Sequence, residues 1–256
     1  MKNTEIFYFD VDGTILDNET DLISPETIDS INKLQSLGYK IAISTGRPAG
    51  AFKDHPVRSI ANWDAYILSN GGVTLDKDFN IRKNITIDPQ TIHTLIENYK
   101  DTILLEGEDV YLVNGASQAM VDLFAEINME LPPVIEYDNQ EVQKFIITNF
   151  DAIEGGFDHP VFEGLTYEIN AHGRPELYPE ESGKHIAIRN LNKELGITSY
   201  TYFGDGNNDA QAIKNAAVGV AMGNAFEEAI KHSDYVTTKV SDNGITNALK
   251  HYGIIE

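Results

Sequence analysis

The sequence predicts an α/β fold in which a doubly wound parallel sheet is interrupted by a second α/β domain. Near both ends of the chain, short apolar runs alternate with helical patterns, which is typical of a parallel sheet covered by helices. This alternation changes after residue 73 and resumes at Gly183. Polar and acidic clusters also follow several of the predicted strands, where open α/β sheets bind their ligands.

The first predicted strand ends in two carboxylates. Residues 6–9 are apolar and aromatic, as in a strand that is buried on both faces. Asp10 and Asp12 follow, and Gly13 then suits a sharp turn or a close approach of the backbone. Neighbouring carboxylates repel each other unless a cation or a proton offsets their charge. Since Asp and Gly also form ordinary turns, this stretch alone leaves a purely structural role open.

Cap and turn residues divide the next part of the chain into alternating elements. Ser24 followed by Pro25 favours the start of a helix, and Gly38 favours its end. Strands that alternate with helices imply a parallel sheet with right-handed crossovers. The expected elements are a helix over 25–37, strands over 39–44 and 65–69 with a helical segment between them, and a hairpin over 73–87.

The middle of the chain has a different rhythm. From residue 89 to about 170 the pattern predicts a helix, two strands, a helix, a strand, an irregular piece and a strand, of which the strands at 143–149 and 165–170 are the clearest. After Gly183 the sequence predicts a helix over 184–195 and strands at 200–203, 218–222 and 235–237, each followed by a helix. We therefore expect a core formed by residues 1–83 and 179–256, with residues 84–178 inserted as a separate domain.

The composition restricts the possible partners and environment. The chain has 256 residues, no cysteine and a formal net charge of −21, so disulfides and cysteine-bound metals are excluded and binding to nucleic acid is not expected. It has no apolar run long enough to cross a bilayer, and residues 1–5 lack the layout of a signal peptide. These features predict a cytoplasmic protein without a membrane partner, and we expect a monomer or a weak homodimer.

Four polar clusters lie at the ends of predicted strands or at the start of a helix. They comprise residues 10–14, residues 45–47, Lys184 and residues 205–209. Together they would supply four carboxylates, one ammonium group, hydroxyls and glycine-rich backbone. Mg²⁺ prefers carboxylate, water and phosphate oxygens, and backbone N–H groups bind phosphate oxygens. The clusters therefore predict a site for Mg²⁺ and a phosphate group.

These clusters resemble the motifs of the haloacid-dehalogenase-like phosphohydrolases and, among them, the Cof-type phosphatases. The matching stretches are Asp-x-Asp-Gly-Thr at 10–14, Thr-Gly-Arg at 45–47, the lysine at 184 and Gly-Asp-Gly-x-Asn-Asp at 204–209, with Asn-Gly at 70–71 and Met-Gly-Asn-Ala at 222–225 as further landmarks. The resemblance implies a Rossmann-like core with a large α/β cap inserted after the third core strand. It also places the active site between core and cap.

The resemblance further implies a role for each residue. Asp10 would be the nucleophile that forms an aspartyl-phosphate, and Asp12 would protonate the leaving oxygen and then activate water. Lys184 and Thr45 would neutralise and position the phosphoryl group. The other expected phosphate-binding residues are Val11, Gly46, Arg47, Asn70 and Asn208. The expected Mg²⁺ ligands are the Asp10 carboxylate, the Asp12 backbone carbonyl and the Asp205 carboxylate, while Asp209 would orient the metal's waters or Lys184.

The expected activity is Mg²⁺-dependent hydrolysis of a small phosphomonoester, such as a sugar phosphate, another metabolite phosphate, flavin mononucleotide or pyridoxal phosphate. A phosphomutase is the alternative among enzymes, and a non-catalytic sensor of a phosphorylated metabolite is the alternative outside them. Arg47 could be an ion-pair partner instead of a phosphate ligand. The candidates for substrate selection in the cap are Arg174, His172 and Tyr178, which lie just before the return to the core.

Overall fold

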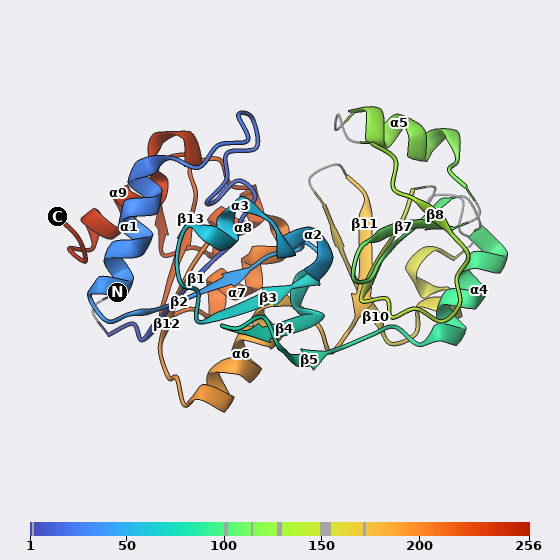
Figure 1. Cartoon of the computed structure of the whole chain (residues 1–256), viewed down its shortest axis with the longest axis horizontal. Helices are drawn as coiled ribbons and strands as arrows, with labels where there is room; N and C mark the ends of the chain where they lie inside the picture. Colours follow the sequence, from blue (N-terminus) through green and yellow to red (C-terminus); the bar gives the residue numbers. More distant parts are fainter. Residues whose placement is uncertain (2, 100–101, 114, 127–129, 149–154, 171–172) are drawn as a thin grey trace.

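The computed structural model describes the chain except for residues 2, 100–101, 114, 127–129, 149–154 and 171–172. Within the described residues the strands form two sheets, one of eight strands and one of six. Figure 1 shows the eight-stranded sheet and its helices on the left and the six-stranded sheet on the right. The predicted α/β fold with a parallel core is confirmed.

The eight-stranded sheet has the order β14-β13-β12-β1-β2-β3-β4-β5. Its strands are β1 (Ile6–Phe9), β2 (Lys40–Ser44), β3 (Ala65–Leu68), β4 (Val73–Asp76), β5 (Ile81–Asn84), β12 (Tyr200–Gly204), β13 (Val218–Ala221) and β14 (Tyr235–Val236). The strands from β14 to β3 pair in parallel, whereas β4 and β5 pair antiparallel as the predicted hairpin. The carboxyl ends of β1, β2 and β12 therefore meet at one edge.

Helices cover both faces of this sheet. They are α1 (Pro25–Ser36), α2 (Ala49–Lys53), α3 (Pro56–Ser59), α6 (Lys184–Leu195), α7 (Ala210–Asn215), α8 (Glu227–His232) and α9 (Gly244–His251). The side chains of β1 alternate between two apolar clusters: Phe7 and Phe9 pack with residues of α1 and α9, and Ile6 and Tyr8 pack with residues of α6 and α7. The helical segment expected before β3 is split into α2 and α3 at Pro56, which favours the start of a new helix.

The six-stranded sheet has the order β10-β11-β9-β6-β7-β8. The elements of this part are α4 (Pro89–Tyr99), β6 (Ile103–Glu106), β7 (Val110–Val113), α5 (Gln118–Glu126), β8 (Val134–Ile135), β9 (Lys144–Ile147), β10 (Leu165–Ile169) and β11 (Pro175–Pro179). One apolar cluster joins the sheet to α4, and a second cluster, around Ile146, joins the opposite face to α5. The inserted segment thus has its own apolar cores.

Strands β8 and β11 are absent from the elements expected from the sequence. β11 begins and ends with proline, a residue that cannot donate to a strand ladder and is rare inside sheets. It nevertheless pairs antiparallel with both β10 and β9. This pairing brings Glu176 and Tyr178 of β11 onto one face of the sheet.

The change from one sheet to the other occurs close to the expected domain boundaries. Asn84 is the last residue of β5 in the first sheet, and Pro179 is the last residue of β11 in the second. Each lies one residue from the boundaries expected at 83/84 and 178/179, and the division into two domains stays a prediction. In the described part of the chain, no helix has the length and apolarity required to cross a membrane.

Candidate active site

Asp10 lies at the carboxyl end of β1, on the edge of the parallel sheet. Its N–H donates to the carbonyl of Phe203 in neighbouring β12, at 2.9 Å, so the backbone is held in the ladder up to this residue. The side chain is 8% exposed, and its Oδ1 accepts a hydrogen bond of 2.7 Å from Lys184 Nζ. The expected nucleophile is therefore buried and paired with a cation.

Lys184 is the first residue of α6 and is 1% exposed. Its Nζ donates to Asp10 Oδ1 and to Asp209 Oδ1, each at 2.7 Å. Burial alone would lower the pKa of Lys184, but the two carboxylates outweigh burial and hold this pKa above its usual value. The ammonium group therefore stays charged and fixed between two strand-end carboxylates.

Asp209 connects this lysine to the loop after β12. Its Oδ2 accepts the N–H groups of Asp205 and Gly206, at 3.0 and 2.9 Å. Its Oδ1 accepts from the hydroxyl of Tyr202 at 2.6 Å as well as from Lys184. Since both oxygens accept hydrogen bonds from protein groups, Asp209 positions the loop and the lysine.

Asp205 lies opposite Asp10 and is 7% exposed. Its oxygens accept hydrogen bonds from Thr14 Oγ1 at 3.2 Å and from Asn224 Nδ2 at 3.3 Å. The close approach of the two loops requires Gly13, since a Cβ atom there would lie 2.1 Å from Asp205 Oδ2 and the backbone has φ of +76°. The glycine that follows the two carboxylates therefore brings the first loop against Asp205.

The charges in this site favour a bound cation. Oxygens of Asp10, Asp205 and Asp209 lie within 4.8 Å of one another. Burial, followed by the charge of Asp209, raises the pKa of Asp205 to about 7 and that of Asp10 well above its ordinary value. Among these described groups, three carboxylates face the single ammonium of Lys184. An oxygen-rich site with uncompensated negative charge suits Mg²⁺.

The side chain of Asp12 turns away from Lys184 and pairs with Arg47. The guanidinium donates to both carboxylate oxygens, from Nε at 2.9 Å and from Nη2 at 2.6 Å. Hydrogen bonding to Asp12 raises the pKa of Arg47, and about a third of each side chain remains exposed. Arg47 therefore forms an ion pair, the role that the sequence analysis gives as the alternative to binding phosphate. Its contact with phosphate stays a prediction.

The expected phosphate-binding residues lie in the loops that follow β1, β2, β3 and β12. Thr45 is buried at the end of β2, and its carbonyl accepts the N–H of Asn70 at 3.1 Å. Asn208 Nδ2 donates to Asn70 Oδ1 at 2.9 Å. Gly46 leaves room for this pair, because a Cβ atom there would lie 2.9 Å from Asn70 Oδ1. Val11 is buried between Asp10 and Asp12, and its carbonyl accepts N–H groups of the following turn.

Comparison with known proteins assigns this arrangement to a family. The haloacid dehalogenase-like hydrolase pattern matches residues 7–249. The chain belongs to the haloacid dehalogenase-like (HAD) hydrolases. The resemblance stated from the motifs is therefore confirmed.

Named relatives of this HAD hydrolase are phosphatases. The 5-amino-6-(5-phospho-D-ribitylamino)uracil phosphatase YcsE of Bacillus subtilis is 27% identical over 258 residues, covering 97% of this chain and 95% of the relative. The phosphatase BT1666 of Bacteroides thetaiotaomicron has a TM-score of 0.87 and 26% identity, covering 98% and 96% of the two chains. The subclass IIB sugar phosphatase BT4131 has a TM-score of 0.82 and 25% identity, covering 98% and 100%. The chain is accordingly a HAD-type phosphatase.

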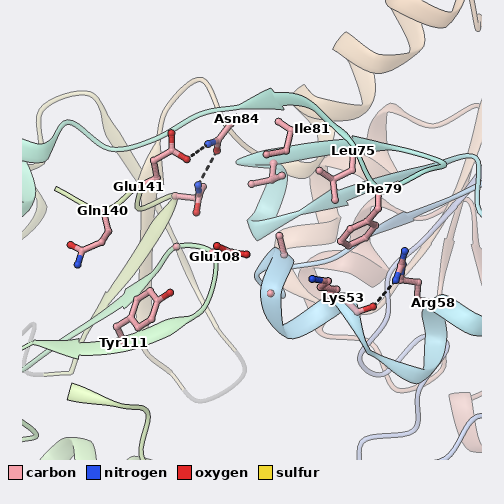
Figure 2. Close-up of a pocket in the computed structure, with 15 residues that line it drawn as sticks. Lys53, Arg58, Leu75, Phe79, Ile81, Asn84, Glu108, Tyr111, Gln140 and Glu141 are labelled. Atoms are coloured by element: carbon pink, nitrogen blue, oxygen red, sulfur yellow. Dashed lines mark hydrogen bonds between the residues drawn. The ribbon is translucent and has the colours of Figure 1, made fainter. Parts of the chain in front are cut away.

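A prominent pocket in this HAD phosphatase is lined by residues other than the catalytic candidates. It has a volume of about 630 Å³ and lies between the two sheets. Figure 2 shows Lys53, Arg58 and Phe79 on one side and Glu108 and Tyr111 on the other. Neither Asp10 nor Lys184 is among the described residues that line this pocket. The catalytic candidates are therefore identified by their buried charges and not by pocket size.

The structure adds site contacts for residues to which the sequence analysis assigns no role in this HAD phosphatase. Tyr202 and Asn224 bind Asp209 and Asp205, respectively, and Glu176 accepts from Asn70 Nδ2 at 3.1 Å. Tyr202 could have been identified from the sequence, because its phenol is a polar group in a strand that is otherwise predicted to be buried.

The three cap candidates have separate outcomes. Tyr178 lies in β11, which pairs with β10, the strand that carries Glu168. Arg174 donates to the carbonyl of Thr148 at 3.3 Å. His172 lies outside the described residues. Their part in substrate selection stays a prediction.

Proposed function

We propose that this HAD phosphatase hydrolyses small phosphomonoesters through an aspartyl-phosphate formed on Asp10, with Mg²⁺ as its cofactor. The observation that carries the proposal is the buried contact of Lys184 with both Asp10 and Asp209, beside Asp205. Burying several like charges is costly, so their convergence at a strand edge is a strong sign of function. Three carboxylates and one ammonium leave an excess of two negative charges, which one divalent cation would offset.

The residues present fit a magnesium ion. The Asp10 carboxylate, the Asp12 backbone carbonyl and the Asp205 carboxylate would hold it, while Asp209 keeps the loop and Lys184 in place. When bound, Mg²⁺ offsets negative charge so that an anionic nucleophile can approach an anionic phosphate. Burial, followed by the charge of Asp209, raises the pKa values of Asp10 and Asp205, and a bound cation would favour the charged form of both carboxylates.

In the first step a carboxylate oxygen of Asp10 forms a bond to phosphorus as the bond to the leaving oxygen breaks. Lys184, the Thr45 hydroxyl and the Asn208 amide contact the phosphoryl oxygens and stabilise the charge that develops on them. The proton of Asp12 passes to the leaving oxygen, which requires Asp12 to exchange its pairing with Arg47 for contact with the substrate. The leaving group departs as an alcohol.

In the second step water attacks the phosphorus of the aspartyl-phosphate. Asp12 accepts a proton from this water, the bond between phosphorus and Asp10 breaks, and inorganic phosphate leaves. Asp10 is then regenerated as a carboxylate and Asp12 is protonated again. Atoms and protons balance over the two steps, and no oxidant or reductant is needed.

We further propose that residues 84–178 form the cap that selects the substrate. The C-terminal part of this segment meets the core close to the catalytic edge, since Asn70 contacts Glu176. Two relatives are a sugar phosphatase and a phosphatase of a ribityl phosphate, which supports a sugar phosphate or a similar metabolite phosphate as the substrate.

The two carboxylates of the first loop provide the test. Asp10→Asn should stop phosphate release from every substrate. Asp12→Ala should slow the hydrolysis of an alkyl phosphate by about 10²–10⁴, because the departing alkoxide needs a proton. With p-nitrophenyl phosphate, whose leaving group needs little protonation, the same variant should give a burst of nitrophenol and then slow turnover, with phosphate retained on the protein.

Magnesium affinity is measured in parallel, because the substitution at Asp12 can move the backbone carbonyl. If metal binding is intact and Asp12→Ala slows both substrates equally without a burst, the two roles of Asp12 are wrong. Isomerised product without free phosphate would indicate the phosphomutase. Metabolite binding without any turnover would indicate the sensor.

A further inference from the structure

A row of charged side chains crosses one face of the six-stranded sheet. In strand order it consists of Glu168 in β10, Glu176 in β11, Lys144 in β9 and Glu106 in β6. Glu168 pairs with Glu176 and Glu106 pairs with Lys144 in the strand register, so the members share a face. The same face carries the apolar residues Ile146 and Leu104 farther along, where α5 covers them. Packing against α5 therefore explains the apolar residues of this face but does not explain its charged residues.

The row lies against the loops that carry the proposed phosphate site. Lys144 Nζ donates to the carbonyl of Gly46 at 3.2 Å. Glu176 Oε2 accepts from Asn70 Nδ2 at 3.1 Å. At the β10 end, Asn207 Nδ2 donates to the carbonyl of Ile169 at 3.2 Å. These contacts place the charged row against the loops that follow β2, β3 and β12.

The row accepts hydrogen bonds and has no free cation among its described members. The ammonium of Lys144 is 3% exposed as a residue and has three protein partners, since it bonds Glu106 at 3.0 Å, Glu176 at 2.8 Å and Gly46. An ammonium group has three protons to donate, so Lys144 has none left for an anionic ligand. The row has three carboxyl groups and one ammonium, so it has an excess of negative charge above a pH of about 7, where Glu106 loses its proton.

Glu168 is the member of the row that has an unpaired acceptor oxygen. Its Oε2 is buried and, within the described residues, has no hydrogen-bond partner. Leaving a buried carboxylate oxygen unpaired is costly. Burial raises the pKa of Glu168, and Lys184 acts on it in the opposite direction, so the side chain lies within electrostatic range of the catalytic lysine.

We propose that this row selects the leaving group: Glu168 accepts a hydrogen bond from a hydroxyl of the substrate, and the excess carboxylate charge rejects substrates that carry a second anionic group. The preferred class is then a phosphomonoester of an uncharged polyol. This inference rests on the proposed phosphatase function, because it assigns a role at the same site.

Two open-chain substrates test the assignment. Sorbitol 6-phosphate and 6-phosphogluconate have the same carbon chain but differ at the far end, which is a neutral hydroxyl in the first and a carboxylate in the second. The unmodified enzyme should have at least about a tenfold higher kcat/KM for sorbitol 6-phosphate, because one charge-assisted contact changes binding by roughly that factor or more. p-Nitrophenyl phosphate, which has no hydroxyl, is the reference.

Variants at Glu168 separate the hydrogen bond from the charge. Glu168→Ala should lower kcat/KM for sorbitol 6-phosphate about tenfold or more relative to p-nitrophenyl phosphate. Glu168→Gln keeps an acceptor but removes the charge. It should therefore reduce the ratio of kcat/KM for sorbitol 6-phosphate to kcat/KM for 6-phosphogluconate. Glu163→Gln, at an exposed glutamate of the cap, is the control and should change neither ratio.

The outcomes distinguish this inference from the function on which it rests. If the unmodified enzyme releases no phosphate from p-nitrophenyl phosphate, the proposed function fails and the selectivity assignment fails with it. If p-nitrophenyl phosphate is hydrolysed but sorbitol 6-phosphate is not, or is no better than 6-phosphogluconate, only the selectivity assignment is overturned. Equal effects of Glu168→Ala on sorbitol 6-phosphate and p-nitrophenyl phosphate would also overturn it, since they would indicate a structural role.

Discussion

Lys184 is the residue on which the charge balance of the site depends. It is the ammonium group that contacts both Asp10 and Asp209, and all three side chains are buried. Removing one partner from a buried charge set leaves the other charges uncompensated, which costs more than the pair itself contributes. Its replacement therefore affects both the stability and the chemistry of the enzyme.

Lys184→Met should reduce the free energy of unfolding by about 3–5 kcal/mol in the absence of divalent cations. It should also reduce kcat by at least about 10², because a phosphoryl-stabilising group is lost. Urea unfolding and phosphate release measure the two effects. The control is Lys193→Met, at an exposed lysine of the same helix. Equal stability of the two variants without metal would contradict the buried-pair account.

The sequence locates the catalytic candidates but not their pairings. Asp10 and Lys184 can be assigned to strand and helix ends, and parallel strands bring such ends to one edge. The bidentate pairing of Asp12 with Arg47 cannot be derived, because it depends on side-chain rotamers in two separate loops. Asn224 is only a landmark in the sequence, although its amide joins Asp205 to the carbonyl of Gly13.

At the level of single elements, the turn after β1 depends on Gly13. Its backbone has φ of +76°, and a Cβ atom would collide with Asp205. Gly38 also has a positive φ, of +88°, but no atom of the described residues lies within 4 Å of the position that a Cβ atom would take there. The two glycines therefore separate the cost of the backbone conformation from the cost of the contact.

Gly38→Ala should lose roughly 1–2 kcal/mol of stability, the cost of an L-residue in the left-handed region. Gly13→Ala should lose more than this, and its magnesium affinity should fall because Asp205 is displaced. Urea unfolding and magnesium titration of both variants make the comparison. If the two variants lose similar amounts of stability and Gly13→Ala retains its magnesium affinity, then the added Cβ atom does not displace Asp205 and the expectation is wrong.

The pairing of β6 with β9 makes stability dependent on pH. Burial raises the pKa of Glu106 to about 7, although Lys144 beside it acts in the opposite direction. In the unfolded chain the pKa is near the ordinary 4.5. The folded form thus binds the proton more tightly, so this stabilising contribution is complete below the unfolded pKa and is lost as pH rises through about 7.

Glu106→Gln should remove this dependence. The melting temperature of the unmodified enzyme should therefore fall relative to that of the variant as pH rises from about 5 to about 8. Scanning calorimetry across this range provides the measurement, with Glu97→Gln, at an exposed glutamate of α4, as the control. A constant difference between unmodified enzyme and Glu106→Gln would contradict the raised pKa.

Element prediction succeeds where local pattern and tertiary environment agree. The apolar runs of β1, β2 and β3 are buried in the sheet, as the pattern indicates. β11 lies outside this rule, because its prolines and Glu176 disfavour a strand and only the pairing with β9 and β10 specifies one. Since Glu176 and Tyr178 lie in β11, the cap face over the site could not be derived from sequence.

For the whole molecule, magnesium should act as a stabilising ligand. A cation that binds the folded site and not the unfolded chain stabilises by about 2.7 kcal/mol at a concentration of 100 times its Kd. The melting temperature should rise with added Mg²⁺, and excess EDTA should abolish phosphate release. Asp205→Asn should show a smaller rise. Full turnover in EDTA, or an equal rise in the variant, would contradict the assignment of Asp205.

Expectations about the whole molecule differ in how far they have been tested. Membership of the HAD hydrolases and the phosphatase class are confirmed by the comparisons. A cytoplasmic location, the state of monomer or weak homodimer and the absence of nucleic-acid partners stay predictions from charge and composition. These properties depend on the cell and on other molecules, so the fold of one chain does not determine them.

The contacts between the two sheets use the backbone at several points. Lys144 bonds the carbonyl of Gly46, Asn207 bonds the carbonyl of Ile169, and the N–H of Gly50 bonds the carbonyl of Glu108. A backbone acceptor persists when its side chain mutates, so these connections survive sequence drift on the accepting side. Two of these acceptors, the carbonyls of Ile169 and Glu108, belong to the inserted segment, so side chains of that segment can change, and with them the substrate preference, while these two contacts with the core persist.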